Sequence, residues 1–325
     1  MGALDYRRLA GTELDVSRVV LGTMTFGSQV DDSVAAEMVG FSIDSGINMF
    51  DTANAYNDGE SERMLARAIK GNRDDVLIAT KVFNPMGDDP KDKGLGRPAI
   101  ERAIDASLER LDTDHVDLYY LHQPDHEVPL EESLGAMKDL VDAGKVRYVG
   151  LSNYAAWQHV EALWLSERNG WQSVKVSQPL LNLLSRRIEE EYAACSAQFG
   201  LSNIVYNPLA GGLLTGKHRR ESAPEEGTRF SMSMYRDRYW NEEQFEAVDR
   251  LQEIAKDEGL SLIELAYRWL LSRPLTDHVL LGASSMEYLK SNLAACDGPE
   301  LDSHTLERCD EVWKVLRGIA PGYNR

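Results

Sequence analysis

The chain has 325 residues, of which 43% are hydrophobic and 27% charged, so it holds enough apolar side chains for a sizeable core. Its formal net charge of −18 argues against binding to nucleic acid or to an anionic membrane surface, because the affinity for phosphates depends on Lys and Arg. A small anionic substrate is compatible with this charge, since a local group of arginines can override the overall field.

The cysteines and the first residues indicate a reducing compartment. Cys195, Cys296 and Cys309 are odd in number and lack the spacing of a metal or redox motif. Arg7 and Arg8 are followed by a mixed polar stretch, whereas a signal peptide has an apolar segment there. No apolar run approaches the roughly 20 residues that a membrane helix needs. We therefore expect a cytoplasmic protein that does not bind membranes.

Short apolar runs typical of buried strands alternate with amphipathic helical patterns. The predicted strands are Val19–Gly22, Ile47–Asp51, Val76–Lys81, Val116–His122, Val146–Ser152, Val174–Gln178, Asn203–Asn207 and His278–Gly282. The predicted helices include Glu60–Lys70, Ala99–Leu111, Leu130–Ala143 and Arg186–Phe199. Eight such units predict a (β/α)₈ barrel that forms one domain over residues 1–325. A doubly wound open sheet is the alternative, because periodicity does not show closure.

Three segments fall outside the repeat. Tyr6–Leu9 and Leu14–Val16 predict a short hairpin that closes the bottom of the barrel. The polar stretch Lys217–Trp240 is predicted to be a long loop, and loops of this length are usually functional or disordered. Asp302–Leu316 predicts an added helix near the end of the chain.

Polar, chemically active side chains stand at the ends of six successive predicted strands. These residues are Asp51, Lys81, His122, Ser152 with Asn153, Gln178, and Tyr206 with Asn207. In a barrel of this type all these strand ends open on one face, where active sites are built. One such residue would mean little, since a lone Asp can form a turn and a lone His can be a core residue. Such residues at six successive strand ends predict a functional site.

Four residues in this set and beside it form a coherent device for proton transfer. An ammonium within ~4–6 Å favours the phenolate, so Lys81 is expected to lower the pKa of Tyr56 from about 10 by roughly 1–3 units. Asp51 would hold Lys81 and compensate the cost of burying its charge. His122 would orient a substrate oxygen by a hydrogen bond. Tyr56 is then predicted to be a general acid that protonates a carbonyl as hydride reaches the carbon.

Two glycine-containing loops predict a phosphate site. The run Tyr206–Lys217 lets backbone N–H groups approach an anion, and Gly282–Ser285 precedes a predicted helix whose N-terminus favours anions. Barrels often bind phosphate at the loops after strands seven and eight. Gly211–Lys217 imitates a nucleotide-triphosphate loop, but His218 stands where Ser or Thr would hold magnesium.

Two further motifs lack the structural context that their usual function requires. Gly94–Ala99 imitates a dinucleotide fingerprint, yet it follows a polar segment and not a strand. His122 and His126, with Pro124 between them, lack the spacing of metal ligands on a helix. We expect no metal.

The combined motifs resemble the aldo-keto reductase superfamily over nearly the whole chain. They are Leu21–Met24, Asp51–Tyr56, Ala79–Lys81, Leu121–Asp125, Gly150–Tyr154 and Tyr206–Lys217. The resemblance implies a catalytic tetrad of Asp51, Tyr56, Lys81 and His122 that reduces aldehydes or ketones with NADPH. It implies that Ser152, Asn153 and Gln178 hold the nicotinamide carboxamide and that Tyr206 stacks on the ring. Further implied cofactor contacts are Thr23, Met24, Asn207, Pro208, Leu209, Gly211, Gly212, Leu214, Gly216, Lys217, Arg229, Gly282, Ser284, Ser285, Tyr288 and Asn292.

Within the superfamily the chain resembles most the aflatoxin-aldehyde and succinic-semialdehyde reductase branch. That branch binds a substrate carboxylate through an arginine of a Tyr-Arg-x-Arg segment and a terminal arginine, which implies Arg238 and Arg325 here. The implied substrate pocket is Met24, Tyr56, His122, Tyr235, Arg238 and Arg325. The branch suggests a homodimer. Other branches have an arginine for the 2′-phosphate where this chain has Tyr288, so NADH is an alternative cofactor.

A function of another class stays open from the sequence. Potassium-channel β subunits share this superfamily and its tetrad, and a cofactor-binding regulatory subunit would bind NADPH tightly and turn over slowly. An extended segment ahead of the barrel and co-purification with a larger membrane protein would distinguish it. The first of these is not seen before Tyr6.

Overall fold

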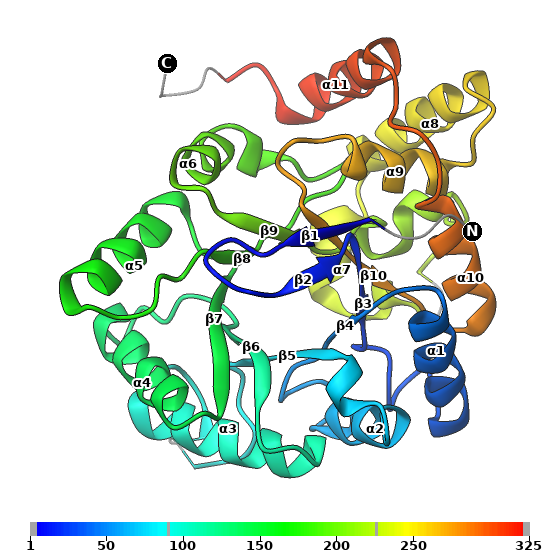
Figure 1. Ribbon diagram of the computed structural model, residues 1–325. Helices are drawn as coiled ribbons and strands as arrows, with labels where there is room; N and C mark the ends of the chain where they lie inside the picture. Colours follow the sequence, from blue (N-terminus) through cyan, green and yellow to red (C-terminus); the bar gives the residue numbers. More distant parts are fainter. Residues whose placement is uncertain (1–4, 90–91, 225–226, 321–325) are drawn as a thin grey trace.

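The computed structural model describes residues 5–89, 92–224 and 227–320, and its centre is a closed barrel of parallel strands (Figure 1). The strands follow the order β10-β3-β4-β5-β6-β7-β8-β9, so the last strand pairs with the first and closes the ring. Their bounds are β3 Val19–Gly22, β4 Met49–Asp51, β5 Leu77–Val82, β6 Val116–Leu121, β7 Val146–Ser152, β8 Val176–Gln178, β9 Ser202–Val205 and β10 His278–Gly282. The predicted barrel is confirmed, and closure excludes the open sheet.

Helices surround the barrel, as Figure 1 shows. Their bounds are α1 Asp32–Asp44, α2 Glu60–Ala68, α3 Arg97–Leu111, α4 Leu130–Asp142, α5 Ala156–Asn169, α6 Tyr192–Phe199, α7 Ser233–Tyr239, α8 Glu242–Asp257, α9 Leu262–Leu271, α10 Met286–Ala295 and α11 Ser303–Arg317. The predicted C-terminal helix is α11, which Asp302 caps by accepting the backbone N–H of Thr305. Within the described ranges, no helix combines the length and apolar character needed to cross a membrane.

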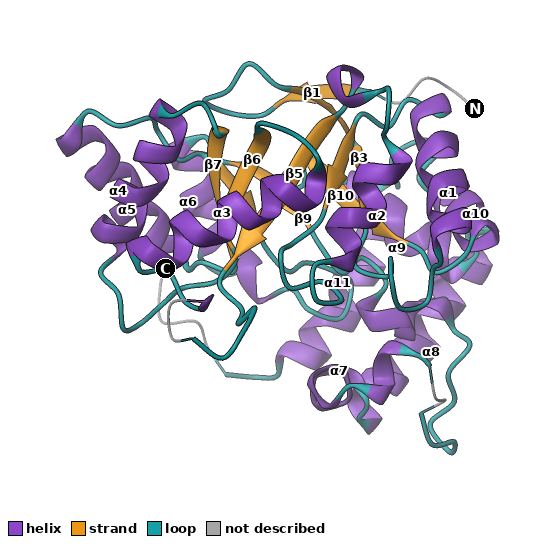
Figure 2. Ribbon diagram, turned by 90° about the horizontal axis from the view of Figure 1, so that it is seen from below, coloured by secondary structure: helices purple, strands orange, loops and turns teal. Residues whose placement is uncertain are grey.

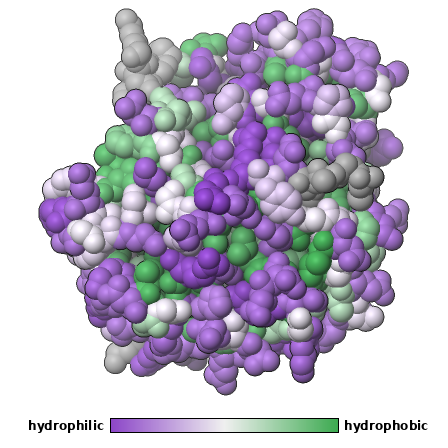
Figure 3. All heavy atoms as spheres, viewed as in Figure 1, coloured by the Kyte–Doolittle hydropathy of each residue, from purple (hydrophilic) through white to green (hydrophobic). Residues whose placement is uncertain are grey.

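The hairpin closes one end of the barrel. Its strands, β1 (Tyr6–Arg8) and β2 (Asp15–Ser17), pair antiparallel, and Leu9, Leu14 and Val16 pack into the apolar cluster inside the ring. The surface that carries the hairpin is largely hydrophilic in Figure 3. In Figure 2 the hairpin lies at one end of the barrel and α7 at the opposite end. The predicted plug is therefore confirmed, and only the far end is left for a site.

Two layers of side chains fill the ring above the hairpin. Met49, Ala79 and Val176 belong to the apolar cluster that the hairpin seals. Because side chains alternate across a strand, the residues two positions further along point inward again. These are Asp51, Lys81 and Gln178, and each is at most 3% exposed. An apolar floor therefore supports a polar layer near the open end.

One predicted loop contains a helix. Within residues 217–240 the structure has a short 3₁₀ turn at Arg229–Ser231 and then α7. Tyr235 and Tyr239 are spaced i and i+4, lie on the same side of α7 and are both buried, which explains why this polar segment folds onto the barrel. The predicted helix over residues 186–199 also starts later, at Tyr192, after a 3₁₀ turn at Arg187–Glu189.

Candidate active site

A buried ion pair lies at the floor of the open end. Lys81 of β5 pairs with Asp51 of β4, and the two side chains are 0% and 1% exposed. Lys81 Nζ also donates to the backbone carbonyl of Thr52 at 2.6 Å. Burial lowers the pKa of Lys81, but the Asp51 carboxylate and Tyr56 outweigh burial and raise that pKa above its ordinary value. The ammonium therefore keeps its charge in a fully buried position.

Tyr56 lies beside this pair, on the turn that follows β4. Lys81 Nζ donates to Tyr56 Oη at 3.3 Å and lies 4.9 Å from the centre of the phenol ring. Asn57 and Asp58 adopt positive φ values of 50° and 54°, and the Asn57 amide donates to the carbonyls of Met24 and Phe26. Polar residues with short side chains tolerate this backbone conformation, which fixes the turn and the phenol that it carries.

The expected drop in the Tyr56 pKa is wrong in its net direction. Burial raises the pKa of Tyr56, Lys81 lowers it, and the Asp51 charge raises it, so that the result lies above the ordinary value. The neighbouring ammonium acts in the predicted sense, but its charge is shared with Asp51, and the partial burial of the phenol disfavours its charged form. The resting group is a neutral phenol.

His122 follows β6 and faces the phenol. Its ring centre lies 6.0 Å from that of Tyr56, with the ring planes at 77°. Its Nδ1 atom is buried and has no hydrogen-bond partner within the described residues. Burial, assisted by the charge of Lys81, lowers the pKa of His122 to about 3. The imidazole is therefore neutral at physiological pH.

The next strand ends join these groups through hydrogen bonds. The Ser152 hydroxyl donates to the backbone carbonyl of Gln178 at 3.0 Å, and the Asn153 amide donates to the carbonyl of His122 at 2.9 Å. Tyr206 Oη donates to Asn153 Oδ1 at 2.6 Å, and Gln178 Nε2 donates to Asp51 Oδ2 at 2.7 Å. The predicted carboxamide and ring contacts thus border the four central residues directly.

The loops after β9 and β10 meet at the same end. Asn207 Oδ1 accepts the N–H of Gly211 at 2.7 Å, and Gly211 and Gly212 have φ values of 70° and 110° that favour glycine. Lys217 Nζ lies 5.8 Å from the ring centre of Tyr288, which is on α10. Both the open backbone and the cation suit a phosphate group beside the N-terminus of this helix.

Arg229 adds a second cation to this region. Its Nη1 donates to Tyr235 Oη at 2.9 Å, and a Cβ built on Gly282 would lie 3.5 Å from its Nη2. Ser285 caps α10 by accepting the N–H of Tyr288, and the Asn292 amide donates to the carbonyl of Gly282. The residues present therefore fit the phosphate end of a dinucleotide.

Some residues predicted to contact the cofactor or substrate have side chains that are buried in the core or already form hydrogen bonds within the protein. Thr23 is 0% exposed, and its hydroxyl contacts the Asp51 carbonyl and Ser61, while Leu214 is 0% exposed within the core. Met24 is half-buried and Arg238 is exposed on α7. Pro208, Leu209 and Gly216 lie in the loop after β9, and Ser284 lies in the loop after β10. Arg325 lies outside the described residues.

One residue of the site, Tyr120, was missed by the sequence analysis. Tyr120 lies inside the barrel, and the charge of Asp51 is among the causes that raise its pKa, although burial contributes most. A Cβ on Gly150 would lie 2.5 Å from the Tyr120 ring, so only glycine leaves room for this phenol. The inward alternation from Leu118 to Tyr120 was the signal that could have revealed it.

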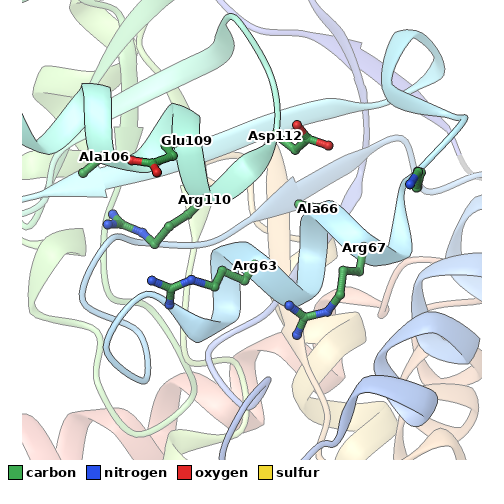
Figure 4. Close-up of a pocket in the computed structure, with 8 residues that line it drawn as sticks. Arg63, Ala66, Arg67, Ala106, Glu109, Arg110 and Asp112 are labelled. Atoms are coloured by element: carbon green, nitrogen blue, oxygen red, sulfur yellow. The ribbon is translucent and has the colours of Figure 1, made fainter.

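A hollow lies on the outer face, between α2 and α3 (Figure 4). It measures about 360 Å³ and is lined by Arg63, Ala66, Arg67, Lys70, Ala106, Glu109, Arg110 and Asp112. All three of its arginines have carboxylate partners, since Arg63 pairs with Glu60, Arg67 with Asp32 and Glu60, and Arg110 with Glu62. It contains none of the strand-end residues and plays no part in the chemistry considered below.

Comparisons with known proteins agree with this geometry. The model of the aldo/keto reductase family matches residues 18–314. Aflatoxin B1 aldehyde reductase member 2 of Rattus norvegicus is 38% identical over 324 residues, covering 94% of this chain and 87% of the relative. Aldo-keto reductase family 7 member A3 of Homo sapiens is 35% identical and covers 94% and 96%. A probable voltage-gated potassium channel subunit beta of Oryza sativa subsp. japonica is 35% identical and covers 95% and 96%.

The buried ion pair predicts a large effect on stability. Replacing Lys81 by Met leaves the Asp51 carboxylate buried without its cation, so the free energy of unfolding should fall by about 3–5 kcal/mol in urea titrations. The matched control is Lys145→Met, which removes the exposed partner of Asp105 and should cost about 0–1 kcal/mol. Equal effects of the two substitutions would contradict the central role of the pair.

Proposed function

The chain belongs to the aldo/keto reductase family and is an oxidoreductase that acts on carbonyl compounds, and from this premise we propose that it reduces aldehydes and ketones with NADPH, with Tyr56 as the general acid. One observation carries the proposal. Tyr56 Oη lies 3.3 Å from Lys81 Nζ, and the neutral ring of His122 stands edge-on to the same phenol. These groups surround one position where a carbonyl oxygen can receive a proton.

The bound cofactor would supply a hydride to the carbonyl carbon. Tyr56 keeps its proton at rest, because its pKa is raised. His122, neutral at this pH, can orient the carbonyl oxygen by a hydrogen bond without adding a positive charge. As the phenol gives its proton to that oxygen, negative charge forms on Tyr56 Oη beside the Lys81 ammonium. The ion pair thus stabilises the charge where it develops.

NADPH is the cofactor that the residues favour. Ser152, Asn153 and Gln178 would hold the carboxamide, and the ring of Tyr206 would support the nicotinamide. The loop from Asn207 to Lys217 would bind the phosphates, and Arg229 together with Lys217 would supply positive charge for the 2′-phosphate. Because Tyr288 brings no charge of its own, NADH is the secondary cofactor.

The preferred substrates would be aldehydes that carry a carboxylate. Arg238 is on α7, which lies at the open end of the barrel (Figure 2). Burial raises the pKa of the nearby Tyr206 to about 12, and the charge of Arg238 opposes this rise. A guanidinium can bind a carboxylate through two parallel hydrogen bonds. The rat relative described above is named as an aldehyde reductase, which supports aldehydes as the class of substrate.

A regulatory subunit is the second candidate, and the 35% identity to a probable potassium channel subunit beta favours it. Such a protein would hold the cofactor tightly and reduce carbonyls only slowly. Single-turnover and steady-state rates separate the two, because an enzyme in the usual sense turns over at about 1 s⁻¹ or faster. A slow rate with stable capture of a membrane protein would support the second candidate.

The role of Tyr56 predicts the effect of removing its hydroxyl. Tyr56→Phe should lower kcat/KM by about 10²–10⁴-fold, which is the usual contribution of a general acid. NADPH binding, followed by quenching of tryptophan fluorescence, should be unchanged. The control is Tyr148→Phe, whose hydroxyl accepts the N–H of Glu13 at the hairpin end. Full activity of Tyr56→Phe would refute the assignment of the acid.

The shifted groups predict the pH dependence of carbonyl reduction. His122 has a pKa of about 3 and Tyr56 has one above its ordinary value, so neither changes its charge near neutral pH. The kcat/KM should therefore stay level through the pH range around the ordinary histidine value of about 6.5 and fall only above the ordinary tyrosine value of about 10. A limb near neutral pH that disappears in His122→Asn would contradict this.

The carboxylate pocket predicts a selective loss. Arg238→Ala should raise the KM for succinic semialdehyde by about tenfold, corresponding to the loss of about 1.5 kcal/mol of charge-assisted hydrogen bonding. The KM for 4-nitrobenzaldehyde, which has no carboxylate, should not change. Arg236→Ala removes a neighbouring exposed arginine of α7 and serves as the control. Equal effects on both substrates would count against the pocket.

A further inference from the structure

The Asp51 carboxylate is held from two sides. Its Oδ1 atom pairs with Lys81, and its Oδ2 atom accepts a hydrogen bond of 2.7 Å from Gln178 Nε2. Gln178 ends β8 and is 3% exposed, and its own backbone carbonyl accepts bonds from the Ser152 hydroxyl and the Asn153 N–H. The backbone of Gln178 is therefore held in place, and its side-chain amide reaches across the barrel to Asp51, which is 127 positions away in the sequence.

We infer that Gln178 is a positioning residue for proton donation: its amide holds the Asp51 carboxylate, and through it the Lys81 ammonium, in place beneath the Tyr56 hydroxyl. The inference about catalysis rests on the proposed function, whereas the contact itself does not. If Gln178 is removed, one carboxylate oxygen loses its donor in a buried site, and the carboxylate is free to turn toward the ammonium. Lys81 then moves relative to Tyr56, which it contacts at only 3.3 Å.

The contact also fixes which end of the Gln178 amide is available to a ligand. A carboxylate only accepts hydrogen bonds, so the NH₂ group must face Asp51. The carbonyl Oε1 is then the end left for a neighbouring group. A carboxamide bound against this oxygen would donate its own N–H to it. The Tyr120 hydroxyl is a second donor beside Gln178, because burial raises the pKa of Tyr120 and a hydrogen bond with Gln178 lowers it. One side chain would thus link the orientation of the cofactor amide to the groups that deliver the proton.

The charged and titratable groups at this end of the barrel stand on β4, β5 and β6 or in the segments that follow β4, β6 and β9. They are Asp51, Lys81, Tyr56, Tyr120, His122 and Tyr206. Of these, Lys81, Tyr56, Tyr120 and Tyr206 have raised pKa values, and His122 has one of about 3. None of these five changes its charge between about pH 5 and about pH 8. A pH effect in that window can therefore be assigned to a group introduced at position 178.

The test of the contact uses Gln178→Glu in the protein without cofactor. Glutamate has the shape of glutamine but places a second carboxyl beside Asp51, and two such groups at hydrogen-bond distance do not both ionise. The introduced carboxyl group should keep a proton, so its pKa is raised in the folded state. Stability is then full below the unfolded value of about 4.3 and is lost as the pH rises through the raised value. We expect Tm, relative to the unsubstituted protein, to fall steadily from about pH 5 to about pH 8.

The matched control is Gln158→Glu. Gln158 is also buried, and its Oε1 accepts the N–H of Ala155 at the start of α5, a position that suits a carboxylate. Its Tm should follow the pH dependence of the unsubstituted protein. Gln178→Met, which has no ionisable group, should be destabilised equally at all these pH values. The same pH dependence in Gln178→Glu and Gln158→Glu would overturn the contact.

The effect on proton donation is read separately in Gln178→Met with saturating NADPH. We expect kcat to fall by about tenfold or more, the KM for a neutral aldehyde to stay within about twofold, and the alkaline limb of the kcat profile to move. The positioning role would be overturned if kcat and the alkaline limb of its pH profile did not change and only the binding of NADPH, measured by fluorescence quenching, became weaker. Gln178 would then serve the cofactor alone. Full activity of Tyr56→Phe would instead refute the proposed function. The Tm measurements on Gln178→Glu without cofactor would still test the contact between Gln178 and Asp51.

Discussion

The ion pair between Asp51 and Lys81 is the constraint on which the rest of the site depends. A buried charge is tolerated only when it is paired and its remaining hydrogen-bonding groups are satisfied. Here the ammonium has Asp51, the Thr52 carbonyl and Tyr56 as partners, and the carboxylate has Lys81 and Gln178. Asp51, Thr52 and Tyr56 come from β4 and the turn after it, Lys81 comes from the adjacent strand β5, and Gln178 comes from β8 on another part of the ring. Neighbouring strands therefore bring the pair together, the closed ring adds Gln178, and the pair in turn decides where the phenol lies.

The hairpin and the apolar floor make this pair effective. Leu9, Leu14 and Val16 seal the lower end of the ring, so water has no access to the pair from that side. The site lies at the end where β3 to β10 terminate, and the buried charges of Asp51 and Lys81 interact more strongly than they would in water. The acidic surface of the molecule, with a net charge of −18, does not determine the chemistry at this point.

Much of this arrangement could be predicted from the sequence, because it depends on the alternation of side chains along each strand and on the order of the strands. Inward positions recur every second residue, so Asp51 and Lys81 had to follow Met49 and Ala79 into the ring once the strands were recognised. The contact between Gln178 and Asp51 could not be predicted, since nothing local relates two residues 127 positions apart. The helix α7 was missed because its polar sequence hides two buried tyrosines. The net pKa of Tyr56 depends on depth of burial, which the sequence does not contain.

The raised pKa of Tyr56 is an advantage for an acid of this kind. A phenol that ionised near neutral pH would lose its proton to water before the substrate arrived, whereas this one stays protonated while the site is idle. The ammonium of Lys81 is largely balanced by Asp51 in that state. Once the proton leaves, the new negative charge lies against Lys81, and an interaction that was weak in the ground state becomes strong. Only such a difference between the two states accelerates a reaction, so the electrostatic work of the pair is concentrated at the moment of transfer.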